Sequence, residues 1–262
     1  MLAAVVERFG QPYTMKQIPR PLSPDGLFSI LPSRGRQVAP LPDGLSATQA
    51  APLMCVGLTI WAALHHERVK SAGRVGIIGA GGGLGHLGVQ FAAHLGKEVL
   101  AIDANDQSLE LVRRIKTGLG LVQSRIHIAD ARITDMDDMR LIGQDSSGAP
   151  STELGLDAVI LLPEPQRAFD MGMKLLRNHG TMVVVSFPQE KLAVSAHDLV
   201  FRDISVVGSL VGRNHQLREM LNFAMLHRVS AEIKTFPFGQ LNELVQKSHQ
   251  GVGGKMVIDM TL

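Results

Sequence analysis

The sequence has little of what several classes of protein require. It has one cysteine, Cys55, among 262 residues, which excludes an internal disulfide framework and leaves no Cys-x-x-Cys pair for a structural zinc site. Its 26 basic and 24 acidic residues are interspersed and give a net charge of +2, so no basic face for nucleic acid stands out. We therefore expect no nucleic-acid partner, and a reducing, cytoplasmic setting.

Signals for export and for membrane insertion are also weak. The apolar run in residues 1–8 includes Glu7 and has no basic lead, which is not typical of a signal peptide. Residues 44–66 carry no formal charge, but Pro52 and polar residues interrupt them, whereas a membrane span needs ~20 predominantly apolar residues. We expect buried helices in this segment and no membrane partner.

One stretch, residues 74–103, organises the rest of the chain. An apolar run ends in Gly79-Ala80-Gly81-Gly82-Gly83-Leu84-Gly85, and a second apolar run ends in Asp103. Glycines allow the positive φ of a tight turn and let a pyrophosphate approach the N–H groups at a helix N-terminus. A carboxylate at the end of the second strand can accept both ribose hydroxyls of an adenosine. The pattern favours nucleotide binding, while the alternative is a glycine turn that only reverses the chain.

The residues around this stretch refine the prediction. Within the ten residues after Asp103 only Arg113 is basic, so no cation is placed for a 2′-phosphate, which favours NAD over NADP. The residues after the glycine turn have helical spacing, so the predicted helix can pack on the sheet. Its apolar face comprises Leu84, Leu87, Phe91, Ala92 and Leu95.

The remaining segments alternate between strand and helix patterns. Apolar strand candidates follow at residues 126–129, 158–162, 182–185 and 204–207, with amphipathic stretches such as 108–119 and 166–176 between them. With the first two strands this predicts an α/β fold of the Rossmann type, a doubly wound six-stranded parallel sheet covered on both faces. Ligands of such sheets bind at the carboxyl ends of the strands, near the switch point where Gly79 would lie.

The flanking segments are shorter and less regular. Residues 1–20 read as two short strands, and six prolines between residues 19 and 42 indicate a linker. Ser46 and Gln49 have the spacing of a capping box at the start of a helix, which Pro52 ends or bends before a helix over 56–65. Helices over 217–227 and 238–246 and a strand over 255–259 complete the pattern.

Four segments together resemble one family. They are Leu41 to Thr59, the glycine run 79–85, Ile204 to Gly212, and Gly253 to Val257. They are similar to landmarks of the zinc-type alcohol dehydrogenases, in the medium-chain dehydrogenase/reductase superfamily, and in particular to its yeast-like branch. The resemblance covers about residues 37–259 and the opening residues 3–10. It implies an NAD(H)-dependent oxidoreductase that transfers hydride between an alcohol and an aldehyde or ketone.

The resemblance also assigns roles to residues. Lys255 matches the position whose basic side chain reaches the cofactor phosphates, and Val185, Ser186 and Phe187 would lie beside the nicotinamide. The segment from Ile204 to Leu210 resembles an edge strand through which family members pair, which implies a homodimer. The implied cofactor-binding positions of the turn and second strand are Gly79, Gly81, Gly82, Gly83, Leu84, Gly85 and Asp103.

The resemblance is incomplete in the part of the family that holds zinc. Residues 19–36 stand where the family has a GroES-like catalytic domain, and of the catalytic zinc ligands only Cys55 remains. Because a catalytic Zn²⁺ needs three protein ligands, we expect no bound zinc. The expected domains are a remnant of the catalytic domain with its linker over 1–45, the NAD-binding domain over 46–230 with leading helices over 46–66, and a segment over 231–262 that returns to a small residual lobe.

Several of these residues have two interpretations. Cys55 is a leftover ligand position or a small buried hydrophobe. His65 can take over a proton relay or can cap the carbonyls at the end of its helix. His86 can face the cofactor or can be a polar residue of the first helical turn. Without zinc a developing alkoxide needs another hydrogen-bond donor, and the candidates are Ser186, His86 and His65.

Three functions therefore stay open at this stage. The first is an oxidoreductase of the alcohol dehydrogenase type that works without zinc on a small alcohol or carbonyl substrate. The second is a non-catalytic NAD-binding protein, either a pseudoenzyme or a partner subunit of a full-length dehydrogenase. The third is a truncated gene product that folds poorly because a covering domain is missing.

Overall fold

A parallel sheet of six strands forms the centre of the molecule. The strands are β3 (Arg74–Ile78), β4 (Glu98–Asp103), β5 (Ile126–Asp130), β6 (Leu156–Leu161), β7 (Leu176–Val184) and β8 (Ser205–Gly208). Their order is β5-β4-β3-β6-β7-β8. The chain runs outward from β3 to one edge and returns to β6, so the switch point lies between β3 and β6. The predicted fold class is confirmed.

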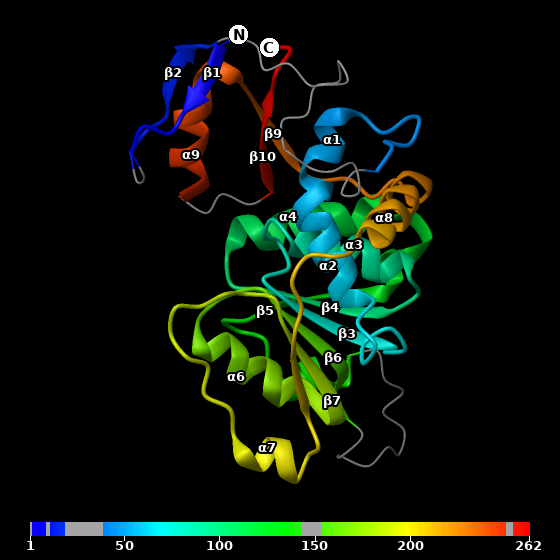
Figure 1. The fold of residues 1–262 in the computed structure, drawn as a ribbon. Coiled ribbons are helices and arrows are strands. Elements are labelled where there is room, and N and C mark those ends of the chain that lie inside the picture. Colours follow the sequence, from blue (N-terminus) through cyan, green and yellow to red (C-terminus); the bar gives the residue numbers. More distant parts are fainter. Residues whose placement is uncertain (1, 9–10, 19–38, 143–153, 250–253) are drawn as a thin grey trace.

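The computed structural model describes residues 2–8, 11–18, 39–142, 154–249 and 254–262. Figure 1 shows that the part with the large sheet is joined to a small lobe that contains both ends of the chain. Most of the linker predicted before Pro42 lies outside the described residues.

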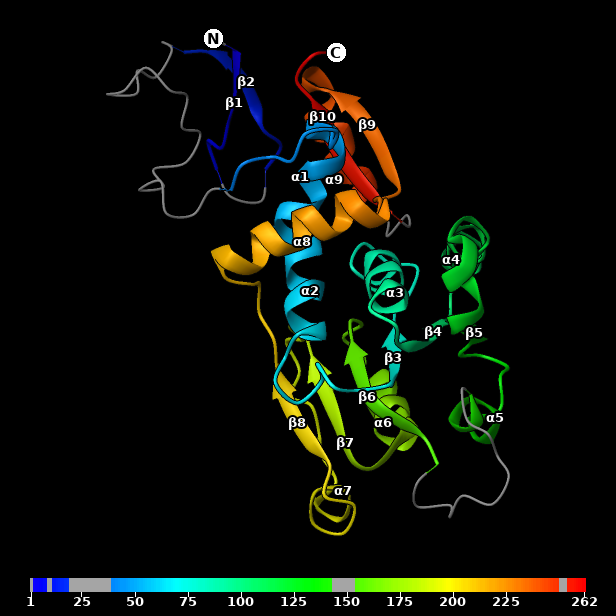
Figure 2. The same ribbon diagram turned by 90° about the vertical axis from the view of Figure 1, so that its right-hand side faces the viewer.

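Helices cover both faces of the sheet, as Figure 2 shows from the side. One face packs against α2 (Leu58–Leu64), α3 (Gly85–His94), α4 (Asp106–Gly118) and α8 (Asn214–His227). The other packs against α5 (Met136–Leu141) and α6 (Gln166–Leu175). Successive side chains of a strand point to opposite faces. In β3, accordingly, Val75 and Ile77 belong to the first cluster and Ile78 to the second.

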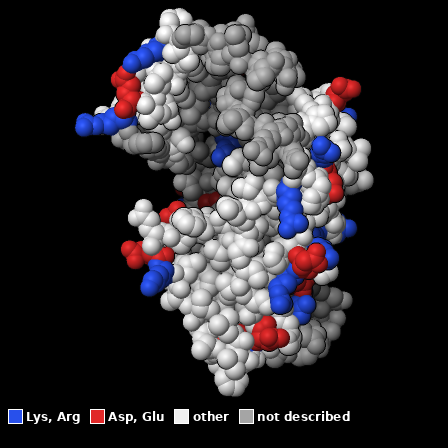
Figure 3. Space-filling model, viewed as in Figure 1, with Lys and Arg blue, Asp and Glu red and all other residues white. Residues whose placement is uncertain are grey.

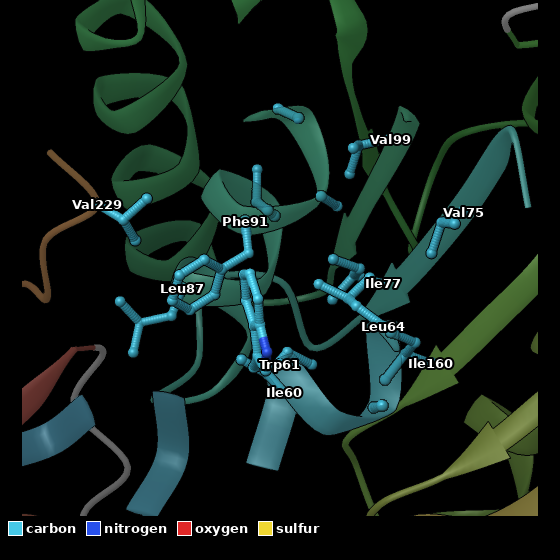
Figure 4. Packing of buried hydrophobic residues seen from close by; sticks show 14 of the residues in the cluster. Ile60, Trp61, Leu64, Val75, Ile77, Leu87, Phe91, Val99, Ile160 and Val229 are labelled. Atoms are coloured by element: carbon cyan, nitrogen blue, oxygen red, sulfur yellow. The ribbon is translucent and has the colours of Figure 1, made fainter. Parts of the chain in front are cut away.

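The core beneath α3 is built around aromatic side chains (Figure 4). Trp61 of α2 meets Phe91 of α3 edge to face, with ring centroids 5.3 Å apart. Leu87, Phe91 and Ala92 are fully buried, which confirms the predicted helix face. Leu84 and Leu95 lie half-buried at its margin.

The helices before the sheet, α1 (Ala47–Pro52) and α2, are joined by a π-helix into one continuous apolar helical segment. Ser46 caps α1 by accepting a hydrogen bond from Gln49 N at 3.2 Å. Pro52 ends α1, and a π-helix (Leu53–Gly57) leads into α2. The stretch Ala47–Leu64 is long and apolar enough to cross a membrane by length and composition, and 61% of it is buried inside the molecule. It packs there as a core helix against α3 and α8.

The small lobe contains two short sheets and a helix. Strands β1 (Leu2–Val5) and β2 (Thr14–Gln17) pair antiparallel, and β9 (Ile233–Pro237) pairs in parallel with β10 (Lys255–Asp259). Helix α9 (Leu241–His249) follows a 3-10 turn (Phe238–Gln240). Asn242 of α9 binds both backbone groups of Tyr13, at 2.8 and 2.9 Å. These bonds tie the first hairpin to the end of the chain.

Four elements of the described chain were not predicted from the sequence. They are β9, α5, a five-residue helix α7 (Ala196–Val200) and a 3-10 helix (Gly120–Arg125). Each is short, and its few apolar residues do not establish the period of a helix or a strand. β9 forms because β10 supplies its hydrogen-bond partner from about twenty residues further along the chain. A single-sequence pattern does not contain that pairing.

Candidate functional site

The glycine turn lies where the carboxyl ends of β3 and β4 meet. Gly79 has φ +84°, a conformation that glycine adopts without strain. The N–H groups of Gly79 and Ala80 both donate to the carbonyl of Ile102, at 2.9 and 3.0 Å. The turn is therefore fastened to β4 before the chain enters α3.

Two glycines of the turn have no room for a side chain. A Cβ on Gly81 would overlap the backbone of Ser108, and a Cβ on Gly85 would lie 2.7 Å from the Cα of Ala80. A Cβ on Gly83 would lie 2.9 Å from Nζ of Lys255, whose flexible side chain would have to move. The first N–H groups of α3 have no acceptor within the helix, and the helix dipole gives this end a partial positive charge. The turn is a bare concave backbone surface with a lysine beside it, which suits a phosphate group.

Asp103 ends β4 and faces the glycine turn. Its Oδ2 accepts a hydrogen bond from Gly81 N at 2.9 Å, and its Oδ1 accepts from Ala104 N at 2.8 Å and Asn105 N at 3.1 Å. A carboxylate has about four accepting positions. These three donors hold Asp103 rigidly, and its carboxylate can accept one more hydrogen bond without losing any of them. The sequence pattern predicts two hydrogen bonds from the ribose hydroxyls.

A cavity of about 590 Å³ opens beside Asp103. It lies at the carboxyl ends of β3 and β4, between the loop after β5 and the start of α6. Two basic residues border it, Arg132 and Arg167. Neither arginine lies within the ten residues after Asp103, so the local sequence pattern did not predict them at this site. The parallel register that pairs Asp103 with Asp130 is what brings Arg132 to the same edge.

His86 is buried under the glycine turn. Its Nδ1 lies 2.7 Å from the carbonyl of Gly82, and its Nε2 accepts a hydrogen bond from Glu232 N at 3.2 Å. Since a carbonyl can only accept and an amide can only donate, Nδ1 carries the proton and the ring is neutral. Burial, together with the charge of Lys255, holds the pKa of His86 below its ordinary value. With both nitrogens engaged, His86 is neither a free donor nor an exposed residue of the first turn.

Two glutamines extend the contact that His86 makes with residues 230–232. Gln90, which is 3% exposed, exchanges two hydrogen bonds with the backbone of Ser230, at 2.9 and 3.1 Å. Gln49 does the same with Ala231, at 3.2 and 3.0 Å. The helix start predicted at Ser46 is confirmed, while the side chain of Gln49 serves this long-range contact.

The contact between His86 and Glu232 extends to Lys255 through the backbone of Glu232. Glu232, whose amide binds His86, accepts a hydrogen bond from Lys255 N at 2.7 Å. The side chain of Lys255 then lies against Gly83. His86 thus connects the glycine turn to the strand that carries its neighbouring cation. Figure 3 shows the face of the molecule hollowed between the small lobe and the part with the sheet.

The segment after β7 lies on the other side of the switch point from Asp103. The amides of Val185 and Ser186 both donate to the carbonyl of Leu161, at 3.1 and 3.3 Å. The hydroxyl of Ser186 is buried and has no partner in the described part of the chain. Phe187 is 93% exposed. Three strand spacings separate β4 from β7, roughly 14 Å, so the edge can take an extended ligand.

His65 lies far from this edge. It ends α2, its Nδ1 lies 2.8 Å from the carbonyl of Trp61, and its ring stacks on the Trp61 indole at a centroid distance of 4.0 Å. The short loop that follows leads into the amino end of β3, whereas the glycine turn leaves the carboxyl end. This placement supports the capping interpretation of His65.

Cys55 differs from the expectation of a small buried hydrophobe. It lies in the π-helix between α1 and α2, and its side chain is exposed. No group of three His, Cys, Asp or Glu residues that could hold a metal ion occurs among the described residues.

These features define a class of protein. A doubly wound sheet, a glycine turn that admits no Cβ, an oriented carboxylate on the next strand and a lysine over the turn together form a Rossmann-type nucleotide-binding domain. Their chemistry fits a dinucleotide, with the diphosphate at the turn and a ribose at Asp103.

Comparison with known proteins identifies the family. The sequence profile of the zinc-binding dehydrogenases matches residues 83–225, which is more than half of the chain. This chain belongs to the zinc-binding dehydrogenase family. An alcohol dehydrogenase of Geobacillus stearothermophilus is 31% identical over 222 residues, which make up 84% of this chain and 60% of that protein. The chain thus spans about 60% of the length of the curated relatives it matches.

Solved structures share the fold. The acetophenone reductase of Geotrichum candidum, in complex with NAD, matches with a TM-score of 0.66 and 24% identity over 83% of this chain and 57% of its own. CAD from Helicobacter pylori, complexed with NADP(H), matches with a TM-score of 0.63 and 22% identity over 84% of this chain and 57% of its own.

Proposed function

We propose that this chain binds NAD(H) and acts as an oxidoreductase of the alcohol dehydrogenase type, without a catalytic zinc held by the described residues. The observation that carries the proposal is the arrangement of the glycine turn, Asp103 and Lys255 at one edge of the sheet. The relatives named alcohol dehydrogenase support the class of reaction. A bound nicotinamide would supply the hydride-transfer chemistry.

The residues of the site have separate tasks in this proposal. The N–H groups at the start of α3 bind the diphosphate, and Lys255 balances its charge. Asp103 accepts a hydrogen bond from the adenosine ribose, and its negative charge opposes a 2′-phosphate. Val185, Ser186 and Phe187 border the nicotinamide end, roughly three strand spacings away. The rigid backbone bonds of Asp103 and the turn fix the two ends of the ligand relative to each other.

The experiment that tests this function is a calorimetric titration of the purified chain with NADH and NADPH. We expect saturable binding of NADH that is tighter than binding of NADPH. Asp103→Ala should weaken NADH binding by about tenfold or more, because a hydrogen bond to a charged group contributes about 1.5–3 kcal/mol. Asp137→Ala, which removes an exposed carboxylate on α5, is the control and should leave binding unchanged. No saturable NADH binding would refute the proposal.

A non-catalytic NAD-binding role is the second candidate, and the candidate donors favour it. His86 has both ring nitrogens engaged, His65 caps α2 at the other end of the sheet, and the Ser186 hydroxyl is buried. Oxidation of NADH in the presence of a panel of aldehydes and ketones separates the two. Turnover supports the enzyme, whereas binding without turnover on any of them supports the binding protein.

We also propose that two copies pair through β8. This strand is the edge of the large sheet, and an edge presents unpaired backbone groups to another chain. Large apolar side chains near it are exposed, including Phe201 at 77% and Leu210 at 86%. Sedimentation analysis should give twice the mass of the chain, and Val206→Pro, which removes a donor in the middle of β8, should give the single mass. A monomeric parent protein would refute the pairing.

A further inference from the structure

A clamp of two carboxylates holds Arg132 at the mouth of the cavity beside Asp103. Nη2 of Arg132 lies 2.5 Å from Oδ1 of Asp106 and 2.6 Å from Oδ2 of Asp130, and Nε lies 2.9 Å from Oδ1 of Asp130. The arginine and Asp103 border the same cavity of about 590 Å³. The guanidinium is thus next to the adenosine end of the proposed site, with two of its three nitrogens in use.

The fold brings the members of the clamp together from two loops. Asp130 pairs with Asp103 in the parallel register of β4 and β5, and Ala131 N donates to the carbonyl of Asp103 at 2.9 Å. Arg132 follows directly. Asp106 is the first residue of α4, three positions after Asp103, and its side chain is 83% exposed. The clamp therefore bridges the ends of β4 and β5 over the rim of the cavity.

The charges around the clamp decide what it can bind. Asp103, Asp106 and Asp130 surround Arg132, while Arg113 stands near Asp130 and Arg167 borders the cavity from α6. A free guanidinium is a strong bidentate ligand for a phosphate. Here Nε and Nη2 are engaged by the two carboxylates, which leaves only Nη1. A 2′-phosphate with about −1.5 to −2 charges would therefore meet a guanidinium whose charge is balanced by the adjacent carboxylates.

We propose that Asp106 is a specificity-determining residue that withholds Arg132 from the 2′ position, so that the site selects a dinucleotide with a free 2′-hydroxyl over its 2′-phosphorylated form. The inference rests on the proposed binding of NAD(H) and extends it to the choice between the two nicotinamide cofactors. Asp106 acts through Arg132 and is a positioning residue, because nothing in the inference requires it to touch the cofactor.

The test measures binding of two small probes, ADP and adenosine 2′,5′-bisphosphate, by calorimetry. In Asp106→Ala the bisphosphate should bind about tenfold tighter than in the parent, because a charge-assisted bond to Arg132 becomes available. Affinity for ADP should change less than about twofold. Glu67→Ala removes an exposed carboxylate paired to Lys70, in the loop between α2 and β3 and outside the cavity lining, and this control should change neither probe.

A second variant keeps the test specific. In Asp106→Ala combined with Arg132→Gln the gain for the bisphosphate should disappear. A gain that survives in this double variant would assign the effect to Arg167 or to charge alone and would overturn the inference, as would an unchanged ratio of the two affinities in Asp106→Ala. Failure of the parent protein to bind ADP or NADH would instead refute the proposed function. Circular dichroism checks that each variant is folded.

Discussion

Replacing Gly85 with alanine is expected to destabilise the fold by about 3 kcal/mol, at the upper end of the usual cost of overpacking, and to abolish NADH binding. A Cβ at this position would lie 2.7 Å from the Cα of Ala80. Both the turn and the start of α3 are backbone, so no flexible side chain can move aside. The turn must open, which displaces the N–H groups proposed to bind the diphosphate. Urea denaturation and NADH titration measure the two effects.

Gly118→Ala is the matched control for this prediction. Gly118 is the last residue of α4, and a Cβ there would meet nothing within 4 Å. Alanine favours a helix over glycine by about 1 kcal/mol, so this variant should be as stable as the parent or slightly more stable, with unchanged NADH binding. Equal stability of the two glycine variants would contradict the tight turn described above.

Replacing His86 with methionine is expected to cost about 1–3 kcal/mol of folding free energy. Methionine fills a similar volume but offers no acceptor to the amide of Glu232, and a polar group left unpaired costs about 1–3 kcal/mol. The carbonyl of Gly82 loses the imidazole donor but keeps the backbone N–H of residue 86, at 3.2 Å. NADH binding should also weaken, because Glu232 positions Lys255 through its carbonyl. His86→Gln, which can serve one of the two groups, should lose less. Equal losses in both variants would argue against the hydrogen-bonded role.

The pH dependence of the same variant gives a second measurement. Because the pKa of His86 is lowered in the folded state, the unfolded chain binds the proton more readily. The stability that the neutral ring contributes is present above pH about 6.5 and is lost as the pH falls below that value. His94, whose pKa burial also lowers, acts in the same direction. Between pH 7.5 and 5.5 the parent should therefore lose more stability than His86→Met, and a parallel loss would contradict this.

The parts of the fold that the sequence predicts are those whose signal is local. The apolar run of β3, the glycine turn, the apolar face of α3 and the acid at the end of β4 follow one another within thirty residues. Each has a physical reason of its own, namely side-chain period, the φ of glycine and the position of a carboxylate. The alternation of strands with helices then predicts a parallel sheet covered on both faces, whereas the order of its strands comes from the structure.

The parts that the sequence does not predict depend on contacts between distant residues. Gln49 has the right spacing for a capping box, but its side chain binds the backbone of Ala231. Arg132 enters the site through the pairing of β4 with β5. Cys55 is exposed, although Leu53 and Val56 of the same π-helix are buried. None of these placements is encoded in the spacing of neighbouring residues.

The anchoring of residues 230–232 has a consequence for how the molecule can be divided. Lys255, the cation beside the glycine turn, lies on β10 near the end of the chain. The side chains of Gln49 (α1), His86 and Gln90 (α3) bind the backbone of residues 230–232, which precede β9, the partner strand of β10. Trimming the chain before residue 230 to isolate a minimal nucleotide-binding fragment would remove the partners that residues 230–232 give to the buried side chains of His86 and Gln90 and to the half-buried side chain of Gln49. It would also remove Lys255. The terminal lobe supplies the lysine beside the glycine turn, so a shortened version meant to keep the proposed site has to include it.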